Sequence, residues 1–225
     1  MLIDGSPHPQ QPGDLIDVDG VLRPTRNSRG QPIHPTIEGV RNFWRWFGES
    51  RMTTEDGRPL VLFHGTNASF DAFDRERSRE GDSLVFTTSN PRVASAFAAY
   101  RTTWGGANVV PVFARAVSLL TVDGKFAPIR DVEDNTVFDG MHYGEGLRSY
   151  AARMGFDGIV FKNVRDDVGP DLLPCDDVYA LFDSAVLKSA IANTGAYIPH
   201  SNSLTDLPCT AENQDDFDTA PSPVF

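Results

Sequence analysis

The apolar residues of this chain gather in short runs bounded by Gly, Pro, Asn and Asp, a pattern that predicts β-strands rather than long helices. The predicted strands cover residues 60–64, 83–87, 109–117, 159–162 and 178–182. Helices do not alternate regularly with these strands, which disfavours a doubly wound parallel sheet. A mixed α+β fold fits the order of the elements better.

Three helices are predicted, one before the first strand and two between later strands. Thr36 is a typical N-cap, and apolar residues at spacings of three and four follow it for about three turns. Trp46 falls off this apolar stripe. The pair Asn90-Pro91 begins a second helix, and a short third helix is predicted at 145–154, after a loop-rich stretch over 123–144.

The two ends differ in composition from the central domain, which is predicted to span residues 36–199. Residues 1–35 are rich in Pro, Gly, Gln and Asn and predict an extended lead-in, in which residues 17–22 are compatible with a short strand. Residues 200–225 hold five acidic residues and no Lys or Arg, and they predict a disordered tail.

Charge and hydropathy exclude several classes of protein. With 20 Lys and Arg against 31 Asp and Glu, the net charge of −11 argues against a non-specific nucleic-acid binder, which needs a basic surface. No apolar run is long enough to span a membrane, and no pair of His, Cys or carboxylates has metal-ligand spacing. The N-terminus does not resemble a signal peptide, so a cytoplasmic location is predicted, with delivery into a host cell as the alternative.

One histidine stands out because it ends a predicted strand. His64 is followed by Gly65 and Thr66, and a ligand can approach a glycine backbone closely because no Cβ is in the way. Phe86 closes the next strand, and Phe97 follows it by eleven residues, within the second helix. This arrangement either sandwiches a planar ligand ring between two aromatic rings or packs both rings in the core.

Segments 62–66 and 84–97 resemble the first two motifs of ADP-ribosyltransferases of the His-Tyr-Glu class, which includes diphtheria-type toxins and poly(ADP-ribose) polymerases. The closer resemblance is to the ADP-ribosyltransferase domains of phage and mobile-element polyvalent proteins. In those domains, stretches like 42–48 and 155–164 accompany the two motifs, and a closing strand like 178–182 follows. The resemblance implies a split β core of two small packed sheets with helices outside.

The resemblance also implies that NAD is the substrate, and it suggests roles for the matched residues. Within the motif His64–Thr66, the histidine would hold a hydroxyl of the nicotinamide-side ribose, and the glycine backbone would bond the carboxamide. Phe86 and Phe97 stand where the family has two tyrosines against the nicotinamide ring. Phenylalanine keeps the stacking face and loses the hydroxyl. Ser95 stands one residue from the serine that the polymerases place on the carboxamide.

The acidic residue of the family is missing from its usual place. The family glutamate begins the last strand and stabilises the positive charge that develops on the ribose as nicotinamide leaves, but Val178 stands at that position. Asp177 is the preferred substitute because it is adjacent, and Asp176 is next because side chains two residues apart share a strand face. Glu145 and the pair Asp166-Asp167 are further candidates on loops.

The predicted function is that of an NAD-dependent ADP-ribosyltransferase, which releases nicotinamide and transfers ADP-ribose to a macromolecular acceptor. The acidic composition favours a protein over a nucleic acid as that acceptor. Two alternatives stay open: an NAD glycohydrolase, which uses water as acceptor, and a catalytically silent module that binds NAD or ADP-ribose. The chain is also compatible with one unit of a longer polyvalent protein, or with a delivered toxin or effector.

Overall fold

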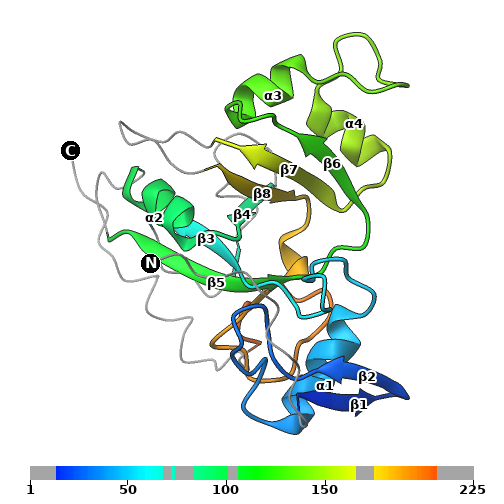
Figure 1. Ribbon diagram of the computed structural model, residues 1–225, viewed down its shortest axis with the longest axis vertical. Helices are drawn as coiled ribbons and strands as arrows, with labels where there is room; N and C mark the ends of the chain where they lie inside the picture. Colours follow the sequence, from blue (N-terminus) through cyan, green and yellow to red (C-terminus); the bar gives the residue numbers. More distant parts are fainter. Residues whose placement is uncertain (1–13, 68–71, 74–83, 101–105, 166–174, 207–225) are drawn as a thin grey trace, which may run out of the picture.

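Four helices and two sheets make up the part of the chain that the computed structural model describes, namely residues 14–67, 72–73, 84–100, 106–165 and 175–206 (Figure 1). The helices are α1 (Ile37–Phe47), α2 (Pro91–Tyr100), α3 (Ile129–Asn135) and α4 (Leu147–Arg153). The strands are β1 (Leu15–Val18), β2 (Val21–Pro24), β3 (Leu62–Thr66), β4 (Val85–Thr88), β5 (Asn108–Ala114), β6 (Leu119–Asp123), β7 (Gly158–Val164), β8 (Asp176–Leu181) and β9 (Leu187–Ser189). This mixture confirms the predicted α+β class.

The larger sheet has seven strands in the order β6-β7-β8-β4-β3-β5-β9, and all neighbours are antiparallel except β6 and β7. β3 and β4 are joined by a single residue pair, Phe63–Thr88, whereas β4 and β8 are paired from Val85 to Thr88. The sheet therefore divides between β3 and β4. The predicted split of the β core is present as this division of one sheet, with β6, β7, β8 and β4 in one half and β3, β5 and β9 in the other.

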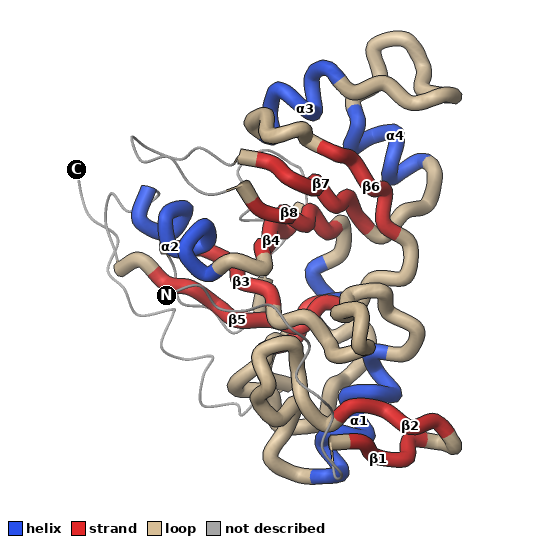
Figure 2. The backbone as a smooth tube through the Cα atoms, viewed as in Figure 1, coloured by secondary structure: helices blue, strands red, loops and turns tan. Residues whose placement is uncertain are grey.

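Helices pack against both halves of the divided sheet (Figures 1 and 2). α2 packs on β3, β4 and β5, while α4 packs on β7 and on its neighbour α3. Beneath α3 and α4 lies an apolar core that includes Ile159, Phe161 and Val178. A larger core joins α1 to the other half, where Phe43 and Phe113 are fully buried.

α1 begins after the predicted N-cap and runs for about three turns, as the apolar spacing predicts. The hydroxyl oxygen of Thr36 accepts the N–H of Gly39, and Gly48 ends the helix with a φ of 55°. Trp46, which lies off the predicted stripe, is nevertheless buried and stacks on Tyr197 with 5.8 Å between ring centroids. The buried side of α1 is wider than its periodicity predicts because a segment distant in sequence covers part of it.

Residues 14–24 form a β-hairpin, so the predicted extended lead-in over 1–35 is wrong for this part. The turn between β1 and β2 has positive φ values at Asp19 (53°) and Gly20 (88°). An Asp-Gly pair favours this type of hairpin turn, and it is the signal that was missed. Val18 and Ile33 are buried in the larger core, which ties the lead-in to the domain.

The chain beyond residue 199 remains part of the fold as far as Asp206, so the predicted disordered tail is wrong for these first residues. The ammonium group of Lys188 on β9 is completely buried and donates to the carboxylate of Asp206 at 2.7 Å. It also donates to the carbonyl oxygens of Ser201 (3.0 Å) and Ser203 (2.9 Å). A buried ammonium needs such partners. These bonds hold residues 201–206 in place. The rest of the tail lies outside the described residues.

The stretch after β5 differs most from the prediction. β5 ends at Ala114 instead of 117, β6 follows the predicted strand in residues for which no element was predicted, and α3 lies in the predicted loop-rich stretch. α3 buries only Ile129 and Val132, which is too few apolar residues to produce a visible helical period. β6 is defined by its parallel pairing with β7, and that pairing joins segments about forty residues apart.

Candidate active site

His64 lies on β3 beside the division of the sheet, and its ring is fixed in orientation. Its Nδ1 is 2.8 Å from the carbonyl oxygen of Phe86 on β4. Because a carbonyl only accepts, Nδ1 carries a proton and donates it to this oxygen. The ring of Phe73 makes an edge contact with the imidazole, at 5.1 Å between centroids. These two contacts hold the His64 ring in one orientation beside β4.

Gly65 is needed for packing between β3 and α2. A Cβ at this position would overlap the carbonyl oxygen of Ala94 and would lie 3.1 Å from the backbone nitrogen of Ala98. The space beside Gly65 is thus filled by α2, which corrects the idea that the missing Cβ leaves room for a ligand. The small residue serves the close approach of a helix to a strand.

We expect Gly65→Ala to destabilise the protein by about 1–3 kcal/mol, because the helix backbone must move away from β3. The measurement is urea unfolding followed by circular dichroism. Gly106→Ala is the matched control, since nothing lies within 4 Å of a Cβ built there and its φ is not positive. Equal unfolding midpoints for both variants would show that α2 does not press on Gly65.

The backbone polar groups of Gly65 point to the division of the sheet. Pro111, opposite Phe63 on β5, has no N–H, and its carbonyl oxygen accepts the N–H of Ala190 at 3.0 Å. Phe63 and Pro111 therefore share no backbone hydrogen bond, and the polar groups of Phe63 and Gly65 face β4. Within the described residues, β3 pairs with β4 at Thr88 alone. The N–H and C=O of Gly65 are thus directed into the place where the strands separate.

The two phenylalanines lie on different elements and do not pack on each other. Phe86 and Phe97 are both half-buried, and no ring contact joins them in the described part of the chain. The guanidinium of Arg148, from the first turn of α4, lies over the Phe86 ring at 5.4 Å from its centroid. Ser95 is exposed on α2, whereas its neighbour Ala94 faces Gly65. The structure therefore does not bring Ser95 to the other candidates.

The carboxylate of Asp177 on β8 is bonded to the neighbouring strand β7. Opposite it, β7 contains a bulge, in which Asn163 has a φ of 53°. The carboxylate of Asp177 accepts the backbone N–H of Asn163 at 3.2 Å and the ammonium group of Lys162. Both oxygens are therefore engaged with the bulge. The bulge was not visible in the sequence because it depends on strand pairing.

Asp176 is held at the turn between β4 and α2, which are the elements that carry Phe86 and Phe97. Its carboxylate accepts the hydroxyl of Ser89 at 3.0 Å and that of Thr88 at 3.4 Å. It lies two residues before Val178 and so shares its strand face, although Val178 itself is buried in the core under α3 and α4. Of the two aspartates, Asp176 is the one whose carboxylate is bonded to the β4–α2 turn, and it also accepts the backbone N–H of Asp177 at 2.7 Å.

The other acidic candidates do not join this group. Glu145 forms a two-bonded ion pair with Arg153, at 2.9 Å for each bond, and accepts the N–H of His142 at 3.0 Å. Hydrogen bonding to Arg153 and to this N–H lowers the pKa of Glu145 to about 2. Its carboxylate is therefore ionised and engaged in the loop before α4. The pair Asp166-Asp167 lies outside the described residues.

The family profile described as ADP-ribosyltransferase in polyvalent proteins matches residues 54–197. The chain belongs to this family. The matched part contains β3 to β9 and all the candidate residues, whereas the β1–β2 hairpin and α1 precede it. Membership in this ADP-ribosyltransferase family places the protein, at the level of class, among the transferases. No curated protein and no solved structure matched the chain.

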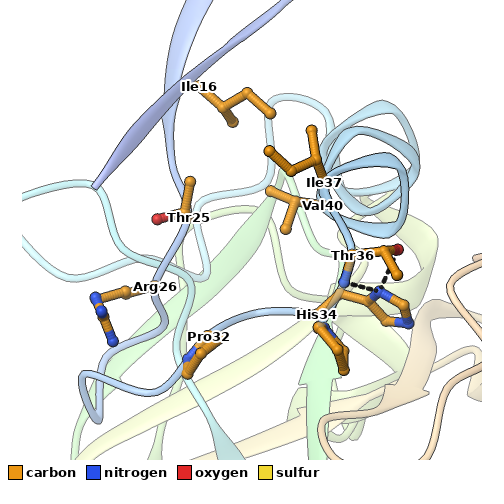
Figure 3. Close-up of a pocket in the computed structure, with 9 residues that line it drawn as sticks. Ile16, Thr25, Arg26, Pro32, His34, Thr36, Ile37 and Val40 are labelled. Carbon is orange, nitrogen blue, oxygen red and sulfur yellow. Dashed lines mark hydrogen bonds between the residues drawn. The ribbon is translucent and has the colours of Figure 1, made fainter. Parts of the chain in front are cut away.

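A separate pocket of about 210 Å³ lies between the β1–β2 hairpin and the start of α1 (Figure 3). Ile16, Ile37 and Val40 contribute apolar side chains to it, together with the ring of His34. The Nδ1 of His34 accepts the backbone N–H of Thr36 at 3.1 Å and so helps to begin α1. None of the ADP-ribosyltransferase motif residues lines this pocket.

Two searches of the described residues gave negative results. They contain no helix that combines the length and the apolar character required to cross a bilayer. They also contain no group of three or more His, Cys, Asp or Glu side chains arranged to bind a metal ion.

Proposed function

We propose that this ADP-ribosyltransferase domain uses NAD as its substrate, releases nicotinamide and transfers ADP-ribose to a macromolecule. The observation that carries the proposal is the pair of groups at the division of the sheet. His64 is oriented by the Phe86 carbonyl, and the adjacent Gly65 turns its N–H and C=O into the same place. A donor and an acceptor side by side match the carboxamide of nicotinamide, which has one C=O and one NH₂.

The aromatic residues support a site for the nicotinamide ring at this place. Phe86 lies within β4 and Phe97 lies on α2, and the two rings are not in contact with each other. We infer that nicotinamide packs against them, with its carboxamide on Gly65 and the attached ribose beside Nε2 of His64. Thr66 completes the motif on β3. Ser95 is left out of the proposal because it is exposed.

Asp176 is our candidate for the acid that the family places at Val178. As the bond between the ribose C1′ and the nicotinamide nitrogen breaks, its electron pair leaves with nicotinamide and positive charge develops on the ribose. A fixed carboxylate stabilises that charge and can take the proton of the acceptor as the new bond to C1′ forms. Ser89 and Thr88 hold Asp176 at the turn between the two aromatic residues.

We expect Asp176→Asn to lower nicotinamide release about a hundredfold. Asp177→Asn changes the neighbouring carboxylate and keeps the size of the side chain. Its nicotinamide release should stay within about threefold of wild type, whereas its thermal midpoint should fall because the bonds to the bulge of β7 are weakened. The measurement is chromatographic quantification of nicotinamide. A large loss of nicotinamide release in Asp177→Asn and a small loss in Asp176→Asn would assign the acid to Asp177.

The burial of Val178 at the family glutamate position favours a second candidate function, a module that binds NAD without cleaving it. Calorimetric titration with NAD, combined with the nicotinamide assay, separates the two functions. Binding without release, both alone and with a mixture of acceptor proteins, would replace the transferase proposal by the binding module. Release at the same rate with and without acceptors would indicate hydrolysis.

A further inference from the structure

The loop between α3 and α4, residues 136–146, stands at the end of the molecule opposite the β1–β2 hairpin (Figures 1 and 2). It presents two large apolar side chains to solvent: Tyr143 is fully exposed, and Val137 is 80% exposed. Single exposed apolar residues are common on protein surfaces. Two exposed apolar side chains on one short loop are less common, and they form a small apolar surface on this loop.

Hydrogen bonds and ring packing fix the shape of this α3–α4 loop. Arg153 donates to both carboxylate oxygens of Glu145 and to the carbonyl oxygen of Gly140 (3.2 Å). The ring of Phe138 stacks on that of Tyr150, with 5.6 Å between centroids and 4° between planes. Neither Tyr143 nor Val137 takes part in these contacts. The loop is therefore held by other residues while these two face the solvent.

The base of the loop touches the proposed nicotinamide site. Glu133 in α3 and Arg148 in α4 are joined across the base by two hydrogen bonds, of 2.6 and 3.0 Å. The same Arg148 guanidinium lies over the Phe86 ring. The base of the loop is thereby linked to one of the residues that we assign to NAD.

The surface around the loop is acidic. Between Ile129 and Arg153, two of the five acidic residues, Glu133 and Glu145, are paired with arginines. The other three, Asp131, Asp134 and Asp139, are exposed, against a single further basic residue, Arg130. Such a surface repels the phosphates of a nucleic acid and attracts basic side chains. An exposed tyrosine ring also binds Arg and Lys side chains through its face.

We propose that the α3–α4 loop is the docking surface for the acceptor and that the acceptor is a protein which presents a segment rich in Lys and Arg. Tyr143 and Val137 contact the aliphatic and cationic parts of that segment, and the exposed aspartates around them pair with its charges. This inference rests on the proposed transferase function, because it identifies the class of acceptor for that reaction.

The experiment uses the full chain and a synthetic peptide of alternating Arg, Lys and Gly, with a peptide of alternating Glu and Gly and a single-stranded DNA oligonucleotide as comparisons. Calorimetric titration without NAD measures binding. The double variant Tyr143→Ser/Val137→Ser and the charge variant Asp134→Asn/Asp139→Asn test the surface. Ile191→Ser is the matched control, because Ile191 is 76% exposed elsewhere on the chain.

We expect the wild type and Ile191→Ser to bind the basic peptide, and each loop variant to bind it about tenfold more weakly. Nicotinamide release from NAD alone should stay the same in all of them, while transfer to the peptide falls with binding. Equal binding of the basic and acidic peptides, or unchanged binding in the loop variants, would overturn the proposal. Preferential DNA binding that the loop variants lose would assign the loop to nucleic acid instead. A wild type that binds the peptide but releases no nicotinamide would refute the proposed function and not the docking surface.

Discussion

Replacing His64 with alanine is expected to lower nicotinamide release from NAD by about a hundredfold or more. The imidazole is held by the Phe86 carbonyl at the division of the sheet, and loss of a group that positions a reacting substrate commonly costs this much. The assay is chromatographic quantification of nicotinamide at saturating NAD, with and without a mixture of acceptor proteins.

A control is needed because the His64 ring also joins β3 to β4. His200→Asn removes an exposed imidazole elsewhere, and asparagine tolerates the positive φ of 63° at that position. This variant should retain wild-type release. Circular dichroism should show that the His64 variant is folded. A folded His64→Ala protein with wild-type release would remove His64 from the site and with it the main support for the proposed function.

Replacing Asp206 with asparagine is expected to cost about 3–5 kcal/mol in the free energy of unfolding. The variant leaves the ammonium group of Lys188 buried without its counter-charge, and breaking a buried ion pair on one side has this magnitude. Both side chains of the pair are completely buried. The measurement is urea unfolding, and we expect a clear fall in the transition midpoint.

Two further variants separate this effect from a general loss of charge. Lys188→Met/Asp206→Asn removes both charges, and asparagine tolerates the positive φ of 52° at position 206. It should recover part of the lost stability because no buried charge remains. Asp19→Asn breaks an exposed ion pair with Arg45 and should change the midpoint little. If Asp206→Asn unfolds at the wild-type midpoint, the ion pair does not anchor residues 201–206 to β9.

Local signals were sufficient where an element carries its own pattern. Thr36 and the apolar spacing after it predicted α1, and Asn90-Pro91 predicted the start of α2, because capping and periodicity act within a few residues. The strand that carries His64 was predicted from its apolar run, although β3 continues through Gly65 to Thr66. The hairpin at Asp19-Gly20 was also within reach of the sequence, since its turn signal is local.

Other features depend on pairing between distant segments. Asp177 was preferred over Asp176 from adjacency alone, but the bulge at Asn163 engages Asp177, and the Ser89 hydroxyl engages Asp176. Burial of Trp46 requires Tyr197, which comes from the other end of the chain. No periodicity within a short window contains this information, because each contact joins residues that are far apart in sequence.

The sequence by itself therefore determined the α+β class, the family, and the identity of the motif residues His64, Gly65, Phe86 and Phe97. These follow from residue type and local order. Only the tertiary structure decided that the sheet divides between β3 and β4, that α2 occupies the space beside Gly65, and that Ser89 and Thr88 engage the carboxylate of Asp176. The physical reason is that strand register and helix packing are set by contacts across the whole chain, which select one partner for each polar group among several that the sequence allows.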